Sequence, residues 1–310
     1  MEFFKPGSQI AFMRHRKAAV ILSALLVVIS LASIFINKFN FGIDFTGGTL
    51  IEVAYPEAAD LGAVRSALAD GFADAQVLHF GSARDVLIRI APRPEESSAA
   101  LSERVMQILR KGAAGVEMRR VEFVGPQVGK ELTEKGGLAI TYALIGILIY
   151  VALRFEYRFA IGAVAATLHD VIVVLGVFSL FRIEFDLTVL AAVLAVIGYS
   201  LNDTIVVFDR IRENFRRMRK GSPEQIMNAA INETLSRTIM TSGSTLLVVT
   251  AMFYFGGKVI HSFSLALLIG IVVGTFSSIY VASVSVLALG LSKADMLPVK
   301  KEGAEQDERP

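Results

Sequence analysis

Residues 187–208 read LTVLAAVLAVIGYSLNDTIVVF, and this run contains a single acidic or basic side chain, Asp203. A helix needs about 20 apolar residues to cross the ~30 Å hydrocarbon core of a membrane, so this run is long enough to do so. Five further apolar runs follow the same pattern, at residues 18–36, 136–153, 159–181, 239–255 and 263–289. The sequence therefore predicts an α-helical polytopic membrane protein with six transmembrane helices.

The composition of the whole chain agrees with this class. Of its 310 residues, 54% are hydrophobic and only 19% are charged, whereas soluble domains are about 25% charged. The net charge is only +2, so we expect no nucleic-acid partner. Cysteine is absent, which excludes a disulfide framework and thiolate chemistry.

The distribution of Lys and Arg in the short connections predicts the orientation. With the amino terminus inside, 17 of them lie in the cytoplasmic tails (1–17 and 292–310), the 154–158 turn and the loop 209–237, against only Arg182 and Lys258 outside. We therefore expect both termini in the cytoplasm, with the chain in a bacterial-type cytoplasmic (inner) membrane. Residues 18–36 could instead be a cleaved signal peptide, but they end in SIFI, which offers no small-residue cleavage site.

Residues 37–135 are too many for a structureless connection, so they predict a folded domain outside the membrane. Strands are expected at 39–45, 49–55, 76–80, 85–91 and 116–124, with a turn at Gly47-Gly48, and helices at 61–71 and 97–111. The order β-α-β-β-α-β suggests a small α+β, ferredoxin-like sandwich. Residues 136–291 would then form a five-helix bundle beside the first span.

Small residues predict close helix packing in two of the spans. Gly270 and Gly274 form a GxxxG step in the sixth, and Ala191, Ala195 and Gly198 recur at helical spacing in the fourth. Such residues let neighbouring backbones approach each other.

Ionisable side chains within apolar runs are candidates for function, because each costs roughly 2.5–3.5 kcal/mol on insertion scales. At about 1.5 Å per residue, Asp203 and Arg237, which begins the fifth span, lie at similar depth and could form an ion pair. Asp203 could instead be solvated beneath the headgroups, with Arg237 extended towards them. Asn202, Thr204 and Thr241 are expected as supporting polar side chains.

Asp170 lies near the middle of the third span, next to His169. It is a second functional candidate, although a hydrogen bond to His169 and to a neighbouring helix could make it purely structural. No other His lies near His169 in a span, so we expect no metal site there.

The loop after the fourth span is basic. Its charged side chains would contact anionic lipid headgroups or a protein partner; they are Arg210, Arg212, Arg216, Arg217, Arg219 and Lys220. The sequence SPEQ at 222–225 is typical of a helix start, with a Ser cap and Pro at the first position. We expect a helix that lies along the inner membrane surface.

Three motifs are similar to one known family. They are FGIDFTGG at 41–48, which includes Asp44, Gly47 and Gly48; His169-Asp170; and GYSLNDTIVVFDRIREN at 198–214. By these motifs, and by the order of its spans, the chain resembles the SecF members of the SecD/SecF family of protein-export membrane proteins, which are similar to the RND superfamily of transporters.

The resemblance implies a subunit that acts with a SecD-like partner to draw unfolded exported polypeptide out of the SecYEG channel. The energy source would be the proton gradient (proton-motive force), without a bound cofactor. In the family, an Asp of the fourth span and an Arg at the start of the fifth belong to the proton pathway, and they match Asp203 and Arg237. We include Asp170 as a further candidate, and a SecD-like partner would supply another Asp.

Other functions fit the residues less well. A half-unit of an RND-type small-molecule or lipid exporter is the main alternative, but the single small outer domain argues against it. An aspartyl protease needs two carboxylates that share a site, and the family motifs around its aspartates are missing at Asp170 and Asp203. The nearest approach to a Walker A loop, residues 125–131, is one residue short. We therefore expect that the protein is not an enzyme. A passive assembly factor is a further alternative, and only Asp203 and Arg237 argue against it.

Overall fold

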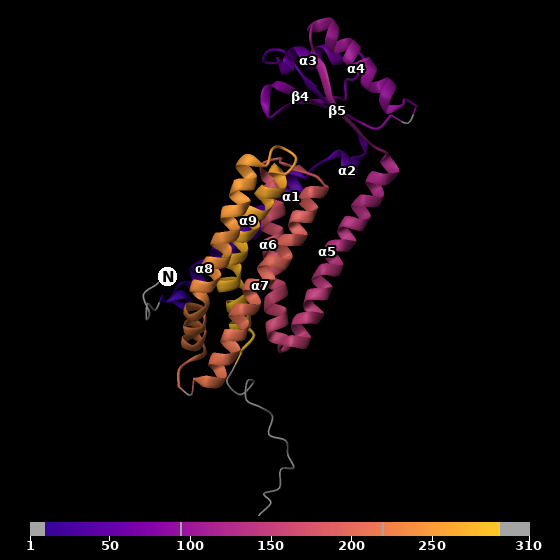
Figure 1. Ribbon diagram of the computed structural model, residues 1–310. Coiled ribbons are helices and arrows are strands. Elements are labelled where there is room, and N and C mark those ends of the chain that lie inside the picture. Colours follow the sequence, from indigo (N-terminus) through magenta and orange to yellow (C-terminus); the bar gives the residue numbers. More distant parts are fainter. Residues whose placement is uncertain (1–9, 94, 219, 292–310) are drawn as a thin grey trace, which may run out of the picture.

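The computed structural model describes residues 10–93, 95–218 and 220–291. It consists of a long helix bundle and a small sheet domain beside one end of it (Figure 1). Among the described residues, six helical stretches are long and apolar enough to cross a membrane, as predicted. We call the end of the bundle beside the sheet domain the near end, and the opposite end the far end.

The six stretches occur in the predicted order, and several extend beyond the predicted limits. They are α1 (Arg16–Asn37), preceded by the 3-10 turn η1 (Phe12–His15); α5 (Pro126–Arg154); α6 (Tyr157–Leu180); α7 (Leu187–Arg217); α8 (Pro223–Phe255); and α9 (His261–Ser277), continued by the π-helical turn η2 (Ser278–Ala282) and by α10 (Ser283–Ala288).

Helix α5 begins well before the predicted residue 136. Pro126 occupies its first turn, where a missing N–H costs nothing and the fixed φ favours a helix. Its 29 residues span about 43 Å, more than the ~30 Å hydrocarbon core. Residues 126–135, predicted as part of the outer domain, are therefore the near end of this helix, and the last strand of the sheet domain ends at Val124.

The predicted surface helix after residue 222 is wrong. Ser222 does form the predicted capping box with Gln225, but the helix that starts there is α8, which continues without a break to Phe255. The reason lies in its first turns, where Ile226, Met227 and Ile231 are buried in the same core as Phe215 of α7. These apolar side chains pack onto the bundle instead of lying on lipid.

The sheet domain has the predicted order of elements from residue 48 onward. They are β2 (Gly48–Ala54), α3 (Leu61–Leu68), β3 (Gln76–Phe80), β4 (Ser82–Ile90), α4 (Ser98–Gly112) and β5 (Glu117–Val124). The strands lie in the order β3-β4-β2-β5, and every pairing is antiparallel. Ile51 and Ile88 of the sheet pack with Val64 and Leu101 of the helices in one core. Helices α3 and α4 lie on the side away from the bundle (Figure 1).

The predicted strand at 39–45 is wrong. Only β1 (Asn40–Phe41) is extended, it is followed by the helical turn α2 (Ile43–Thr46), and it pairs in parallel with β6 (Glu184–Phe185) just before α7. Phe39, Phe41 and Phe45 pack around Phe185, with ring centroids 5.4 to 6.0 Å apart. The alternating phenylalanines therefore fill a cluster at the near end of the bundle instead of lining one face of the sheet.

Candidate functional site

Asp203 lies at the meeting point of three helices. It is only 2% exposed in α7, and its Oδ2 atom accepts a hydrogen bond from the Ser242 hydroxyl of α8 over 3.2 Å. The Ser242 hydroxyl also lies 2.9 Å from that of Thr275 in α9. The buried carboxylate is thus held by one neutral hydroxyl group, which in turn contacts a second one.

Arg237 stands on α8 five residues before Ser242, which places it about 7.5 Å farther along the axis towards the far end. No ion pair or hydrogen bond joins it to Asp203 in the part of the chain that the structure describes; the partner that α8 supplies is Ser242. Arg237 instead lines a cavity of about 390 Å³ together with Asn202, Asp209 and Glu233. Arg237 therefore lies nearer the far end than Asp203 does, and a hydroxyl occupies the place expected for the guanidinium.

Asp170 is fully buried in α6. Its Oδ1 atom lies 2.9 Å from Nδ1 of His169. Its Oδ2 atom accepts hydrogen bonds from Ser200 of α7 at 2.5 Å and from Ser277 of α9 at 2.7 Å. Asp170 therefore ties together the three helices α6, α7 and α9.

The surroundings of the two aspartates are connected through α7 and α9. Ser200 lies one helical turn before Asp203 on α7, and Ser277 lies two residues after Thr275 on α9. This hydroxyl layer, defined here as Ser200, Ser242, Thr275 and Ser277, was missed by the sequence analysis. Two signals could have found it: the one-turn spacing of Ser200 from Asp203, and that of Ser277 from Gly274 of the GxxxG step.

The GxxxG step makes the hydroxyl layer possible. A Cβ atom added at Gly270 would lie 2.1 Å from Cγ2 of Val196, and one at Gly274 would lie 3.1 Å from Cβ of Ser200. Helices α7 and α9 therefore approach closely enough for short serine side chains to reach Asp170. The predicted close packing of the sixth span is confirmed.

The packing face predicted for the fourth span is wrong within this chain, since Ala191, Ala195 and Gly198 are exposed. Helix α7 packs through Val193, Val196 and Ser200 instead.

The other predicted polar residues form no hydrogen bond to either aspartate in the described part of the chain. Thr204 is buried in α7, and Asn202 is exposed at the mouth of the far-end cavity. The Thr241 hydroxyl bonds to the carbonyls of Arg237 and Thr238 on its own helix. It makes no cross-helix bond among the described residues, in contrast to Ser242.

The FGIDFTGG motif forms a joint between the sheet domain and the bundle. Asp44 accepts a hydrogen bond from the backbone N–H of Leu187 over 3.0 Å, so it caps the first turn of α7. Gly47 and Gly48 have φ values of 70° and 124°, which favour glycine. A Cβ at Gly47 would lie 2.9 Å from Cα of Pro126, where α5 begins. The motif thus fixes two membrane helices to one end of the sheet.

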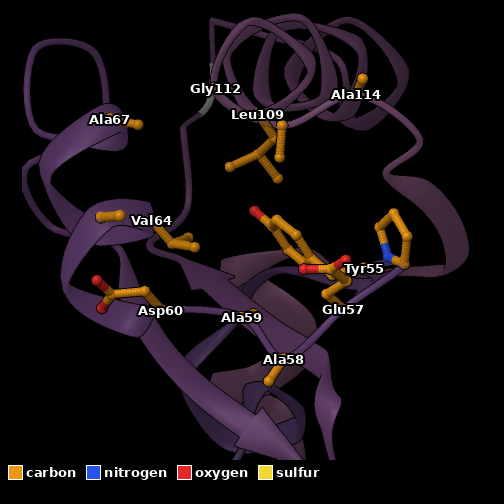
Figure 2. A pocket seen from close by; sticks show the side chains of 13 residues that line it. Tyr55, Glu57, Ala58, Ala59, Asp60, Val64, Ala67, Leu109, Gly112 and Ala114 are labelled. Carbon is orange, nitrogen blue, oxygen red and sulfur yellow. The ribbon is translucent and has the colours of Figure 1, made fainter.

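The sheet domain also carries a hollow of about 420 Å³ between α3, α4 and the end of β2. Figure 2 shows the Tyr55 ring rising inside it with its hydroxyl directed towards Leu109, and the carboxylates of Glu57 and Asp60 on its walls. Burial raises the pKa of the Tyr55 hydroxyl. This hollow is far from both aspartates and does not belong to the intramembrane site.

The bundle interior brings two carboxylates and one imidazole together with serine and threonine hydroxyls, which both donate and accept hydrogen bonds. The described residues contain no group of three or more His, Asp or Glu side chains that could hold a metal ion.

Comparison with known proteins places the chain in a family. Residues 104–292 match the model for the C-terminal part of protein export membrane protein SecD/SecF, and residues 32–55 match the SecD/SecF GG motif. The chain is 55% identical to protein translocase subunit SecF of Vibrio alginolyticus over 100% of its own length and 99% of that protein. It is 50% identical to the SecF subunit of Pseudomonas aeruginosa, over 97% and 98% of the two chains.

Solved structures agree. The fold is similar to SecDF from Thermus thermophilus, described as a translocon-associated membrane protein, with a TM-score of 0.84 and 36% identity. The match covers 93% of this chain but 39% of that one, so this chain spans about two fifths of the SecDF polypeptide. From the two matched models and the full-length relatives, we conclude that the chain belongs to the SecD/SecF family of protein export membrane proteins.

Proposed function

We propose that this chain is a non-catalytic, SecF-type subunit that acts with a SecD-like partner to promote movement of exported proteins through SecYEG. The proton gradient would supply the energy, with no bound cofactor. The observation that carries the proposal is the buried Asp203 carboxylate, held by Ser242 of α8, with a second buried carboxylate, Asp170, held by hydroxyls of the neighbouring turns of α7 and α9. Ionisable groups are costly inside a membrane, so a residue of this kind that is buried there is a candidate for function.

The orientation follows from the charges. We place the far end of the bundle, with both chain termini, in the bacterial cytoplasm, because Arg210, Arg212, Arg216 and Arg217 lie there at the end of α7. These side chains can contact anionic headgroups. The sheet domain then lies outside the cytoplasmic membrane.

The proton step would take place between α7 and α8. Asp203 takes up a proton in one arrangement of the two helices and releases it in the other. The cavity lined by Asn202, Asp209, Glu233 and Arg237 lies on the far-end side of this site and would bring cytoplasmic water towards it. Arg237 at its wall would stabilise the ionised form of Asp203 when the helices bring the two together. A SecD-like partner completes the pathway.

The sheet domain would contact the exported polypeptide. Its edge strands β3 and β5 can pair with an extended chain, and the hollow at Tyr55 (Figure 2) can accept an apolar side chain. The rival function, a small-molecule or lipid exporter half-unit, is not favoured, since the full-length relatives are named as translocase subunits.

The proposal can be tested by replacing the SecF gene of a bacterium with this chain and following secretion of a reporter protein. Secretion should be restored, should fall when an uncoupler collapses the proton gradient, and should require a SecD-like protein that co-purifies with the chain. A chain that restores secretion without such a partner, or that changes only sensitivity to small toxic molecules, would contradict the proposal.

A further inference from the structure

Besides the FGIDFTGG joint, the sheet domain touches the near end of the bundle through two side-chain contacts, and the first is made by Arg89 of β4. This side chain is 10% exposed. Its Nη1 donates to the carbonyl of Phe41 over 3.0 Å, and its Nη2 forms an ion pair with Glu184. Arg89 therefore binds both strands of the small β1–β6 pair.

Glu184 leads directly into α7. Asp186, two residues later, caps α7 by accepting a bond from the N–H of Val189 over 2.8 Å, and Asp44 accepts one from Leu187. At Gly42, a Cβ would lie 3.0 Å from Oε1 of Glu184, so the approach is tight. Arg89 is therefore in close contact with the residues that hold the first turn of α7.

The second contact is made by Lys258 in the connection between α8 and α9. Its ammonium nitrogen lies 3.9 Å from the centroid of the Phe80 ring, at the β3–β4 turn. A Cβ at Gly81 would collide with the Lys258 side chain. Burial lowers the pKa of Lys258, while Asp85 and Glu52 oppose that shift. This contact belongs to the connection that follows α8, whereas the Arg89 contact belongs to the strand that leads into α7.

The two contacts are therefore attached to the two helices that meet at Asp203 and Ser242. We propose that the Arg89–Glu184 pair is a positioning pair that converts a shift of α7 against α8 into a tilt of the sheet domain, with the Lys258–Phe80 contact as its pivot. The inference rests on the proposed proton step. It names the residues that would transmit the helix movement to the sheet domain outside the membrane.

The test uses spin labels on the full chain in lipid nanodiscs. The chain has no cysteine of its own, so Ala114→Cys in the sheet domain and Phe181→Cys at the end of α6, both exposed, place one label on each part. Pulsed electron spin resonance then gives the distance distribution between them.

Asp203→Asn, which fixes a neutral side chain, should shift the mean distance between the two labels. Added Arg89→Gln or Glu184→Gln should abolish that shift, whereas Arg84→Gln, an exposed arginine of the same strand, should preserve it.

Exchanging the charges of Arg89 and Glu184 gives a second test. Arg89→Glu and Glu184→Arg should each abolish the shift, and the double variant, with its charges exchanged, should restore part of it. The proposal is overturned if Asp203→Asn leaves the distance unchanged, or if the shift persists undiminished in Arg89→Gln. Failure of the proposed function would be seen separately, as proton-dependent export that survives Asp203→Asn.

Discussion

The hydroxyl of Ser242 donates to Oδ2 of Asp203 over 3.2 Å, so the α8 partner of this buried carboxylate is neutral rather than cationic. A hydroxyl can donate to a carboxylate and can accept from a carboxylic acid. The same contact can therefore form in both protonation states of Asp203. In each state the Thr275 hydroxyl can either accept from or donate to the Ser242 hydroxyl. A guanidinium in this place would favour only the ionised state.

Replacing Ser242 should weaken both stability and export. Ser242→Ala removes the hydrogen-bond donor from a buried carboxylate, at an expected cost of about 1–3 kcal/mol in the free energy of unfolding, and interrupts the hydroxyl layer. Ser242→Thr keeps the hydroxyl and should retain most of the activity. Ser244→Ala is the control, because among the described residues that exposed hydroxyl bonds only to a carbonyl of its own helix. Equal export by Ser242→Ala and Ser244→Ala would show that Ser242 has no role.

Two glycines within the membrane helices should respond in opposite ways to alanine. Gly270→Ala places a methyl group against Val196, and such overpacking costs about 1–3 kcal/mol. Gly243→Ala on α8 meets no atom within 4 Å and should stabilise the helix by about 0.5–1 kcal/mol. Thermal unfolding in detergent measures both. A Gly270→Ala variant as stable as the parent would show that α7 and α9 are less tightly packed.

Glu184 should contribute a pH-dependent term to stability. Burial raises its pKa, with further increases from Asp186 and Asp44, while Arg89 opposes them. Between the ordinary glutamate pKa and this raised value, the native protein binds more protons than the unfolded chain. Its free energy of unfolding therefore rises as the pH falls through that window. Glu184→Gln should remove this rise, as followed by denaturant unfolding at several pH values. The exposed Glu57→Gln should keep it, and an unaltered pH dependence in Glu184→Gln would refute the assignment.

The sheet domain should fold alone, because residues 48–124 contain a complete core of their own. This fragment is expected to unfold cooperatively by circular dichroism. Leu101→Ala, at a position only 2% exposed, should cost about 2–5 kcal/mol. Leu78→Ala, at a position 43% exposed, should cost far less. A fragment without a cooperative transition would mean that the bundle is needed to hold the sheet together.

Much of this architecture could be predicted from the sequence because its signals are local. Apolar length identifies a membrane helix wherever it occurs, and period-two strands around capped helices identified the order of the sheet domain. Ser222 and Gln225 predicted a helix start correctly, since the capping box involves only neighbouring residues. The continuation of that helix into the membrane could not be predicted, because it depends on the burial of Ile226 and Met227 against distant residues.

The candidate site was predicted only in part for the same reason. Charge inside a span identifies Asp170 and Asp203 without any structure. Their partners, Ser200, Ser242, Thr275 and Ser277, are uncharged and resemble ordinary packing residues in the sequence, so only the helix arrangement brings them together. Likewise, residues 39–45 alternate like a strand, but Phe41 pairs with Phe185, which lies 144 positions later in the chain. A local sequence pattern cannot predict so distant a partner.

The measurement that tests the central claim most directly is the translocation of an exported protein into inverted membrane vesicles, with and without an uncoupler. With Asp203→Asn at the parent's protein level and with its partner still bound, the gradient-dependent fraction of the rate should disappear, so that the uncoupler has no further effect on it. Glu131→Gln, an exposed carboxylate of α5 that pairs with Lys135 on its own helix, should retain that fraction. If Asp203→Asn retains it in full, Asp203 is a structural residue and the proton-driven account is wrong.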